Sequence, residues 1–294
     1  MMLAGLAIMI VSEAATLAGI EPFASWNTPI CWTGFILFAD AIVYRARGSS
    51  WLTSAPREFA ALAIVSIPLW LVFEFFNLYI DNWYYDGLPE NWWLRMVGYG
   101  WSFATISPAI FEGADLVAVV RRSSRDLPAQ PALSPQPTLP ARRALPALPS
   151  LPGLVCAALG VAMLAIPFLV SPATARYTAA PVWLGFIFLL DPINAWLGAE
   201  TLTKERIINL SWSGLLCGVL WEFWNYWSRS KWHYSVPIME HLKVFEMPVP
   251  GYLGFPAFAL ECFTMYVFVR AVFLRRVLSS AGDPGPVRTY SIAL

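Results

Sequence analysis

Four glutamates stand inside strongly apolar stretches of this sequence, where a charged group is costly. They are Glu74 and Glu112 in the first half of the chain and Glu222 and Glu261 in the second half. Ionisable residues inside membrane spans are candidates for function by default. Burial disfavours the charged form of a carboxyl group, so such a group can give a proton and a second one can take it back. The four glutamates are therefore the candidate catalytic acids and bases.

Asparagine and aromatic residues accompany these carboxyls. An asparagine follows the first glutamate of each half by three residues, and residues at that spacing share one face of a helix. Aromatic faces stabilise cations, which suits chemistry in which a hydrocarbon carries positive charge. The candidate substrate-binding residues are Asn77, Asn225, Trp83, Tyr85, Trp232, Tyr234, Trp221 and Phe73. The alternative is that the Glu and Asn pairs only hold helices together by hydrogen bonds.

Two aspartates and two prolines also recur. Asp40 and Asp191 lie near the ends of apolar stretches, where they either belong to the site, cap a helix or face lipid headgroups. Pro108 and Pro256 come shortly before the second glutamate of each half. A proline within a span frees a backbone carbonyl that must find another partner. Each proline therefore predicts a kinked helix beside a polar cavity.

The chain repeats itself with an offset of about 150 residues, roughly half its length. The segment Trp32–Asp40 recurs as Trp183–Asp191, and the W-x-Y triplet that begins at Trp83 recurs at Trp232. The Glu-x-x-Asn pair is present in both copies. An internal repeat is the first guide to architecture, and this one predicts two related halves.

Composition indicates a polytopic membrane protein. The chain is 58% hydrophobic and only 13% charged, with a mean hydropathy of +0.57, whereas a soluble domain carries about 25% charged residues. Lysine plus arginine and aspartate plus glutamate balance at 19 each, so nothing favours nucleic acid as a partner. The four cysteines are isolated, without metal-binding or redox spacing, and no phosphate loop or pair of haem histidines is present. We expect no metal and no cofactor, and membrane lipids and an apolar substrate as partners.

The apolar runs predict the fold class all-α, a polytopic bundle of about eight transmembrane helices. A span needs about 20 apolar residues. With four spans per copy, the two copies are parallel repeats related by an axis along the membrane normal. The expected spans are about Leu3–Ile20, Pro29–Tyr44, Glu58–Ile80, Val97–Val119, Leu154–Val170, Pro181–Leu197, Ile207–Trp227 and Tyr252–Phe273.

The basic residues predict the orientation. Fourteen of the 19 lysines and arginines fall in the termini and in the loops on the same side, and cytoplasmic loops carry the excess of such residues. Both termini are therefore expected in the cytoplasm, with bacterial inner membrane as the expected location. The domains are a first repeat at 1–122, a Pro-rich cytoplasmic linker at 123–151, a second repeat at 152–279 and a disordered tail at 280–294.

The order of motifs resembles the small membrane-integral lycopene cyclases, built from tandem or heterodimeric homologous halves. The matching segments are Glu74–Asn77, Trp83–Tyr85 and Pro108–Glu112, and then Glu222–Asn225, Trp232–Tyr234 and Pro256–Glu261. This chain departs from the family in having single carboxyls with different spacing. The resemblance implies proton-initiated rearrangement of a polyene without net redox change, as in an isomerase or lyase of carotenoid biosynthesis.

Three hypotheses for function stay open at this point. The first is an integral membrane enzyme for acid–base rearrangement of an apolar isoprenoid lipid, of the cyclase, isomerase or hydratase type. The second is a proton- or cation-coupled transporter or channel, in which the carboxyls form the ion path. The third is a non-catalytic membrane scaffold. A closed aromatic cavity favours the enzyme, whereas an aqueous path lined by carboxyls favours transport.

Overall fold

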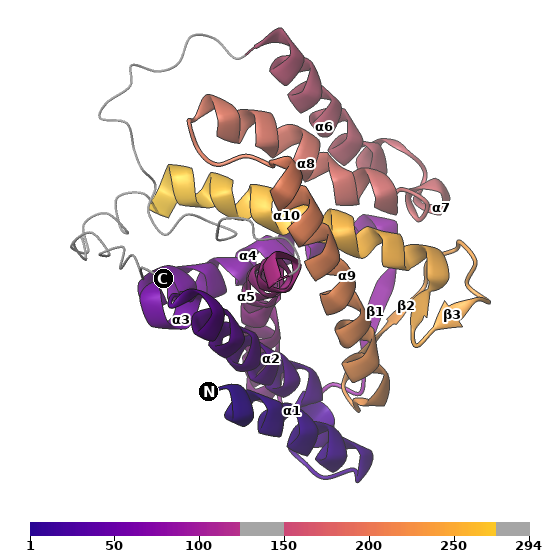
Figure 1. Ribbon diagram of the computed structural model, residues 1–294. Coiled ribbons are helices and arrows are strands. Elements are labelled where there is room, and N and C mark those ends of the chain that lie inside the picture. Colours follow the sequence, from indigo (N-terminus) through magenta and orange to yellow (C-terminus); the bar gives the residue numbers. More distant parts are fainter. Residues whose placement is uncertain (124–149, 275–294) are drawn as a thin grey trace, which may run out of the picture.

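The computed structural model describes residues 1–123 and 150–274, here called the first and second halves. Helices make up nearly all of the described chain, and a few short strands lie together at one end of them (Figure 1). The long helices are α1 (Met2–Leu17), α2 (Phe23–Arg47), α4 (Pro56–Ile80), α5 (Trp92–Ser123), α6 (Leu151–Leu169), α8 (Ala179–Trp196), α9 (Lys204–Trp227) and α10 (Gly254–Val269). The short elements are α3 (Trp51–Ser54), α7 (Pro172–Ala175), β1 (Trp83–Asp86), β2 (Lys231–Tyr234), β3 (Lys243–Val244), β4 (Met247–Pro248), the 3-10 helix η1 (Val249–Leu253) and the π-helical turn η2 (Arg270–Leu274).

Seven helices in the described ranges are long and apolar enough to cross a membrane. Their outward side chains are largely apolar, and large hydrophobic residues such as Ile64, Leu78, Leu169 and Phe273 are exposed. Such a surface suits contact with lipid tails. The molecule is therefore an α-helical bundle of the kind that spans membranes. The remaining expected span, at the N-terminus, corresponds to α1. This apolar helix has 16 residues and is shorter than the usual span, so the count of eight spans stays a prediction.

Glycines allow the helices of each half to pack closely. Gly5 of α1 faces Gly34 of α2, and a Cβ atom on Gly5 would lie 2.5 Å from the Gly34 carbonyl oxygen. Gly160 of α6 faces Gly185 of α8 in the same way, and a Cβ atom on Gly160 would lie 2.7 Å from the Gly185 carbonyl oxygen. Small residues at such crossings are common between membrane helices because they let the backbones approach.

Strands β1 and β2 form an antiparallel pair that joins the two halves, with β1 from the first half beside β2 from the second (Figure 1). Trp83 pairs with Tyr234, Tyr85 pairs with Trp232, and Tyr84 pairs with His233 at the centre. The two W-x-Y triplets are thus each other's strand partners. The sequence predicted the triplets as equivalent positions but did not predict that they form strands.

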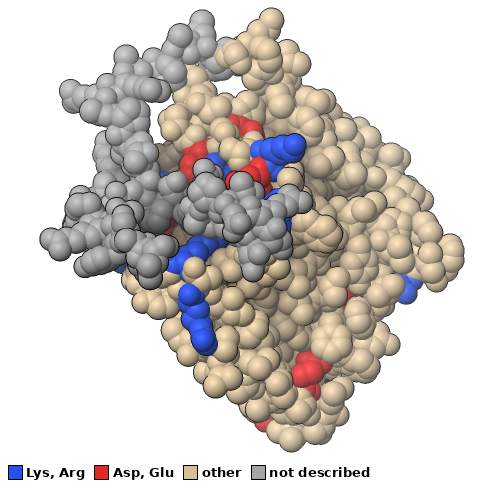
Figure 2. All heavy atoms as spheres, viewed as in Figure 1, with Lys and Arg blue, Asp and Glu red and all other residues tan. Residues whose placement is uncertain are grey.

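Buried ion pairs lie at the end of the helices opposite the strands, here called the charged end. Arg47 forms a buried ion pair with Asp115, 2.9 Å between Nη1 and Oδ1. Arg270 forms another with Glu58 of the other half, 2.6 Å between Nε and Oε1. On the face drawn in Figure 2 most atoms belong to uncharged residues, and the blue and red atoms lie mainly in one region. Of the Pro-rich linker predicted from the sequence only residues 123, 150 and 151 are described, and the predicted tail at 280–294 lies outside the described residues.

The recurring aspartates fix turns at this same end. Asp40 accepts hydrogen bonds from the Leu52 backbone N–H at 2.9 Å and from the Ser50 hydroxyl at 3.0 Å. Asp191 accepts one from the Leu202 backbone N–H at 2.8 Å. Both carboxyls therefore bind the segment that follows their own helix. These hydrogen bonds give the two aspartates a structural role at the helix ends.

Candidate functional site

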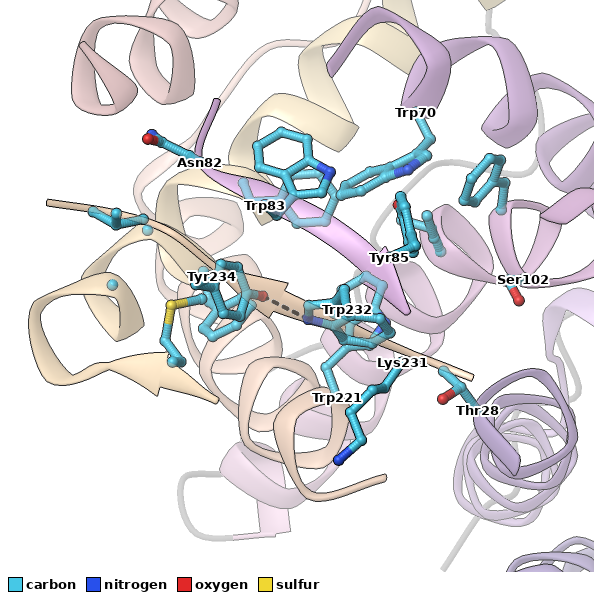
Figure 3. A pocket seen from close by; sticks show the side chains of 18 of the residues that line it. Thr28, Trp70, Asn82, Trp83, Tyr85, Ser102, Trp221, Lys231, Trp232 and Tyr234 are labelled. Atoms are coloured by element: carbon cyan, nitrogen blue, oxygen red, sulfur yellow. Dashed lines mark hydrogen bonds between the residues drawn. The ribbon is translucent and has the colours of Figure 1, made fainter. Parts of the chain in front are cut away.

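A cavity of about 490 Å³ lies at the strand end of the helices, between the two halves. Its wall is rich in tryptophan, tyrosine and phenylalanine, and Figure 3 shows several of these side chains around the two strands. A volume of this size is typical of small-molecule sites, which are concave and mostly apolar with a few placed polar groups. Its aromatic lining includes Trp70, Trp83, Tyr85, Trp221, Trp232 and Tyr234.

In the first half, Glu74 lies behind the cavity wall and binds three side chains of that wall. Its Oε1 atom accepts hydrogen bonds from the Tyr85 hydroxyl at 2.5 Å, from Trp70 Nε1 at 2.7 Å and from Trp83 Nε1 at 3.3 Å. Trp70 is placed by the helix itself, because it precedes Glu74 by four residues on α4. Three donors on one oxygen suit a carboxylate.

In the second half, Glu222 has a similar place but fewer partners. Its Oε1 atom accepts a hydrogen bond from the Tyr234 hydroxyl at 2.9 Å. The indole of Trp232 donates to the Tyr234 oxygen at 2.9 Å, as drawn in Figure 3. Glu222 is fully buried, and its Oε2 atom has no hydrogen-bond partner among the described residues.

One substitution between the halves explains part of this difference. The position four residues before Glu222 is Gly218, where the first half has Trp70. The ring of Phe255 occupies the space beside Gly218, and a Cβ atom there would lie 2.2 Å from it. The second half therefore cannot place an indole donor on its glutamate from this position.

The two asparagines hold the strands in place. Asn225 donates from Nδ2 to the Trp232 carbonyl at 2.8 Å and accepts from the Trp232 backbone N–H at 2.9 Å. Asn77 donates to the Trp83 carbonyl at 2.7 Å and accepts from the Trp83 backbone N–H at 3.2 Å. The same clamp thus orients each W-x-Y triplet, so that its tyrosine reaches the glutamate on the preceding helix. Both halves use the Glu-x-x-Asn spacing for this purpose.

The phenol groups of the two strands lie outside the membrane-spanning helices and are strongly perturbed. Burial raises the pKa of Tyr234 well above its usual range, and the neighbouring Glu222 raises it further. Burial and Glu74 have the same effect on the pKa of Tyr85. Both hydroxyls therefore stay protonated over the ordinary pH range and act as hydrogen-bond donors to the carboxyls.

The deeper glutamates lie apart from this cavity. Glu112 and Glu261 are fully buried, and neither side chain makes a hydrogen bond of ordinary geometry to a described residue. Near Glu112, the Ser66 hydroxyl of α4 contacts the backbone of α5 just before Pro108. It donates to the Phe103 carbonyl at 2.6 Å and accepts from the Ser107 backbone N–H at 3.0 Å.

The second proline has a different place from the one predicted. Pro256 lies in the first turn of α10 instead of the middle of a helix. A proline in a first turn removes no helical hydrogen bond, since the first N–H groups of a helix have no partner within it. The interpretation of both prolines as kinks is therefore wrong for the second half.

The structure divides the predicted site residues into two layers. Trp83, Tyr85, Trp221, Trp232 and Tyr234 line the cavity. Glu74, Glu222, Asn77 and Asn225 stand behind this layer and contact it, while Phe73 packs beneath it on Trp183 with ring centroids 5.1 Å apart. Trp70 was not predicted from the sequence, although its spacing of four from Glu74 places it on the same helix face.

The described residues contain no cluster of three or more histidine, cysteine, aspartate or glutamate side chains that could hold a metal ion. Polar groups at the cavity wall are mainly hydroxyl and indole N–H groups. The arrangement can therefore enclose an apolar molecule and present to it two phenols, each backed by a carboxyl.

Comparison with known proteins gives no match. No family model, no curated protein and no solved structure is similar to this chain.

Proposed function

We propose that this protein is an integral membrane enzyme that rearranges an apolar lipid of the isoprenoid class by acid–base chemistry. The observation that carries the proposal is the aromatic cavity in which the Tyr85 and Tyr234 hydroxyls each donate to a buried or half-buried glutamate. Aromatic faces stabilise a carbocation. A phenol hydrogen-bonded to a carboxyl can pass a proton between the cavity and that carboxyl.

The proposal includes the resemblance to the lycopene cyclases and the two parallel repeats. The mutual pairing of the W-x-Y triplets supports a pseudo-twofold relation of the halves. The equivalent glycine crossings and the equivalent aspartates support it as well. In this arrangement the cavity lies on the axis between the repeats, with one Tyr–Glu pair from each. We place both termini in the cytoplasm of a bacterial cell and the strands on the outer side.

Transport is the second candidate, and the deeper glutamates favour it. Glu112 and Glu261 are fully buried carboxyls that make no hydrogen bond of ordinary geometry to a described residue, and buried carboxyls also form the proton relays of membrane proteins. The cavity itself argues for the enzyme, because the carboxyls stand behind aromatic rings instead of lining an open polar path.

The test is the lipid content of cells with and without the protein. Extracts of a strain that lacks the gene and carries wild type or variants should be compared by liquid chromatography and mass spectrometry. An enzyme converts an isoprenoid into a product that disappears in the deletion strain. The Tyr234→Phe and Glu222→Gln variants should lower that product by about 10²-fold or more, the usual contribution of positioned acid–base catalysis.

Tyr84→Phe is the matched control, because Tyr84 lies on the exposed face of the same strand pair and stacks on His233. This variant should keep normal product. An unchanged isoprenoid profile in the deletion strain, together with pH-dependent ion flux that the Glu112→Gln variant abolishes, would establish transport instead.

A further inference from the structure

The two Tyr–Glu pairs differ in ways that bear on their chemistry. We propose that Tyr234 and Glu222 form the proton-transferring pair, whereas Glu74 remains a fixed carboxylate that stabilises positive charge in the cavity. The inference rests on the proposed function and assigns a separate role to each half. It follows from hydrogen bonds, burial and the residues that line the cavity.

Glu74 accepts more hydrogen bonds than Glu222 does. Oε1 of Glu74 accepts three hydrogen bonds, from one phenol and two indoles. Hydrogen bonds to the charged form favour that form. Protonation of Glu74 would weaken this set of contacts, so this group is suited to carrying a lasting negative charge beside the aromatic wall.

Glu222 lies in a more buried environment than Glu74. This side chain is fully buried and accepts a single hydrogen bond, from Tyr234. A buried carboxylate with so little support is expensive, whereas the neutral acid is not. Glu222 is therefore suited to holding a proton at rest and to losing it only when a positive charge forms nearby.

The Tyr234 oxygen lies between Glu222 and the indole of Trp232. Tyr234 lines the cavity, donates to Glu222 and accepts from Trp232 Nε1 at 2.9 Å. The Trp232 N–H stabilises the oxygen when it carries more negative charge. In the first half the equivalent indole, Trp83, donates to Glu74 instead, so Tyr85 lacks that contact from its own triplet.

The step balances without a further reactant. For the transfer, the protonated Glu222 donates to the Tyr234 oxygen and the Tyr234 hydroxyl hydrogen turns from Glu222 to the substrate, which reverses the direction of the hydrogen bond between them. The Tyr234 O–H bond then breaks as a C–H bond forms at an alkene carbon of the substrate, and the proton of Glu222 restores the phenol. The result is a substrate cation and a Glu222 carboxylate. In the return step a C–H bond beside the cationic carbon breaks, its electron pair forms a new double bond, and the proton returns through Tyr234 to Glu222. Glu74 keeps its charge throughout.

Infrared spectroscopy tests the charge states without reference to any substrate. Difference spectra between wild type and each Glu→Gln variant, in lipid nanodiscs, isolate the band of one side chain. We expect Glu222→Gln to remove a protonated carboxyl band and Glu74→Gln to remove a carboxylate band. Both variants can still accept the tyrosine hydrogen bond, so the fold should persist. Two carboxylates, or the reverse assignment, would overturn the division of roles.

Deuterium uptake then tests the transfer itself. Membranes containing the full chain are incubated in D₂O with squalene or lycopene as probes. Tyr234→Phe should reduce deuterium incorporation at least about 10²-fold, whereas Tyr85→Phe should slow conversion but leave the deuterium content of each product molecule unchanged. Equal uptake by Tyr234→Phe and wild type would overturn the role of Tyr234. If the bands are as expected but wild type incorporates no deuterium from D₂O into either probe, the proposed function fails while the charge difference stands.

Discussion

At the scale of single residues, the glutamate and the asparagine of each Glu-x-x-Asn motif have different tasks: the asparagine holds a strand, and the glutamate binds a tyrosine of that strand. Asn225 holds the backbone of β2 through two hydrogen bonds to Trp232, and Glu222 receives the hydroxyl of Tyr234 from the same strand. The asparagine therefore sets the position at which the tyrosine and the glutamate meet. This explains why the motif and the W-x-Y triplet occur together in both halves.

The raised pKa of Tyr234 predicts a loss of stability in alkali. Above about pH 10 the unfolded chain releases the phenol proton, whereas the folded protein keeps it because burial and Glu222 disfavour the phenolate. Rising pH therefore favours unfolding until it passes the folded pKa. Thermal melting between about pH 9 and 12 should show a steeper decline for wild type than for Tyr234→Phe. Parallel curves would contradict the raised pKa.

At the scale of elements, close contacts between helix backbones shape the bundle. Glycine pairs set the approach of α1 to α2 and of α6 to α8. The Ser66 hydroxyl of α4 makes hydrogen bonds to two backbone groups of α5, the Phe103 carbonyl and the Ser107 N–H. These hydrogen bonds fix α4 to α5. Since Glu74 lies on α4, they also help to fix the position of Glu74.

The glycine crossing of the second half gives a stability prediction. In Gly160→Ala the new Cβ atom would lie 2.4 Å from the Leu189 backbone nitrogen, so α6 must move away from α8. Overpacking of this kind typically costs about 1–3 kcal/mol. Gly100→Ala on α5 is the control, because no atom lies within 4 Å of its added Cβ atom. It should be neutral or stabilising by up to about 1 kcal/mol. Equal melting temperatures for the two variants in detergent would refute the tight crossing.

At the scale of the whole molecule, two contacts join the halves at opposite ends. The β1–β2 pair joins them beside the cavity, and the buried Arg270–Glu58 pair joins them at the charged end. Breaking a buried ion pair by removing one partner is strongly destabilising. The halves are therefore fixed relative to each other on both sides of the bundle.

The proposed orientation is testable by cysteine labelling in intact cells. Ser49 lies at the charged end and Glu90 at the strand end, and both are exposed. In a Cys156→Ser background, whose other three cysteines are buried, a membrane-impermeant maleimide should label Glu90→Cys. It should label Ser49→Cys only after the cells are permeabilised, because basic residues mark the cytoplasmic side. The opposite pattern would reverse the topology.

The sequence by itself determined the helical membrane fold and the equivalent positions of the two halves. Span length and apolar composition are local properties, and the bilayer limits the chain to few structures. The Glu-x-x-Asn spacing and the W-x-Y triplets could likewise be read as related sites. Repetition alone identifies such positions, because it needs no knowledge of which segments lie together.

Only the tertiary structure decided how these residues meet. The pairing of the triplets as strands depends on a contact between residues about 150 positions apart, which no local pattern predicts. The place of Trp70 on Glu74, the filling of the Gly218 position by Phe255 and the separation of Glu112 and Glu261 from the cavity depend on how helices pack. The sequence does not separate wall residues such as Trp83 from residues behind the wall such as Glu74, because both kinds recur at the same spacing in the two halves. Their distinction arises from the direction in which each packed helix faces.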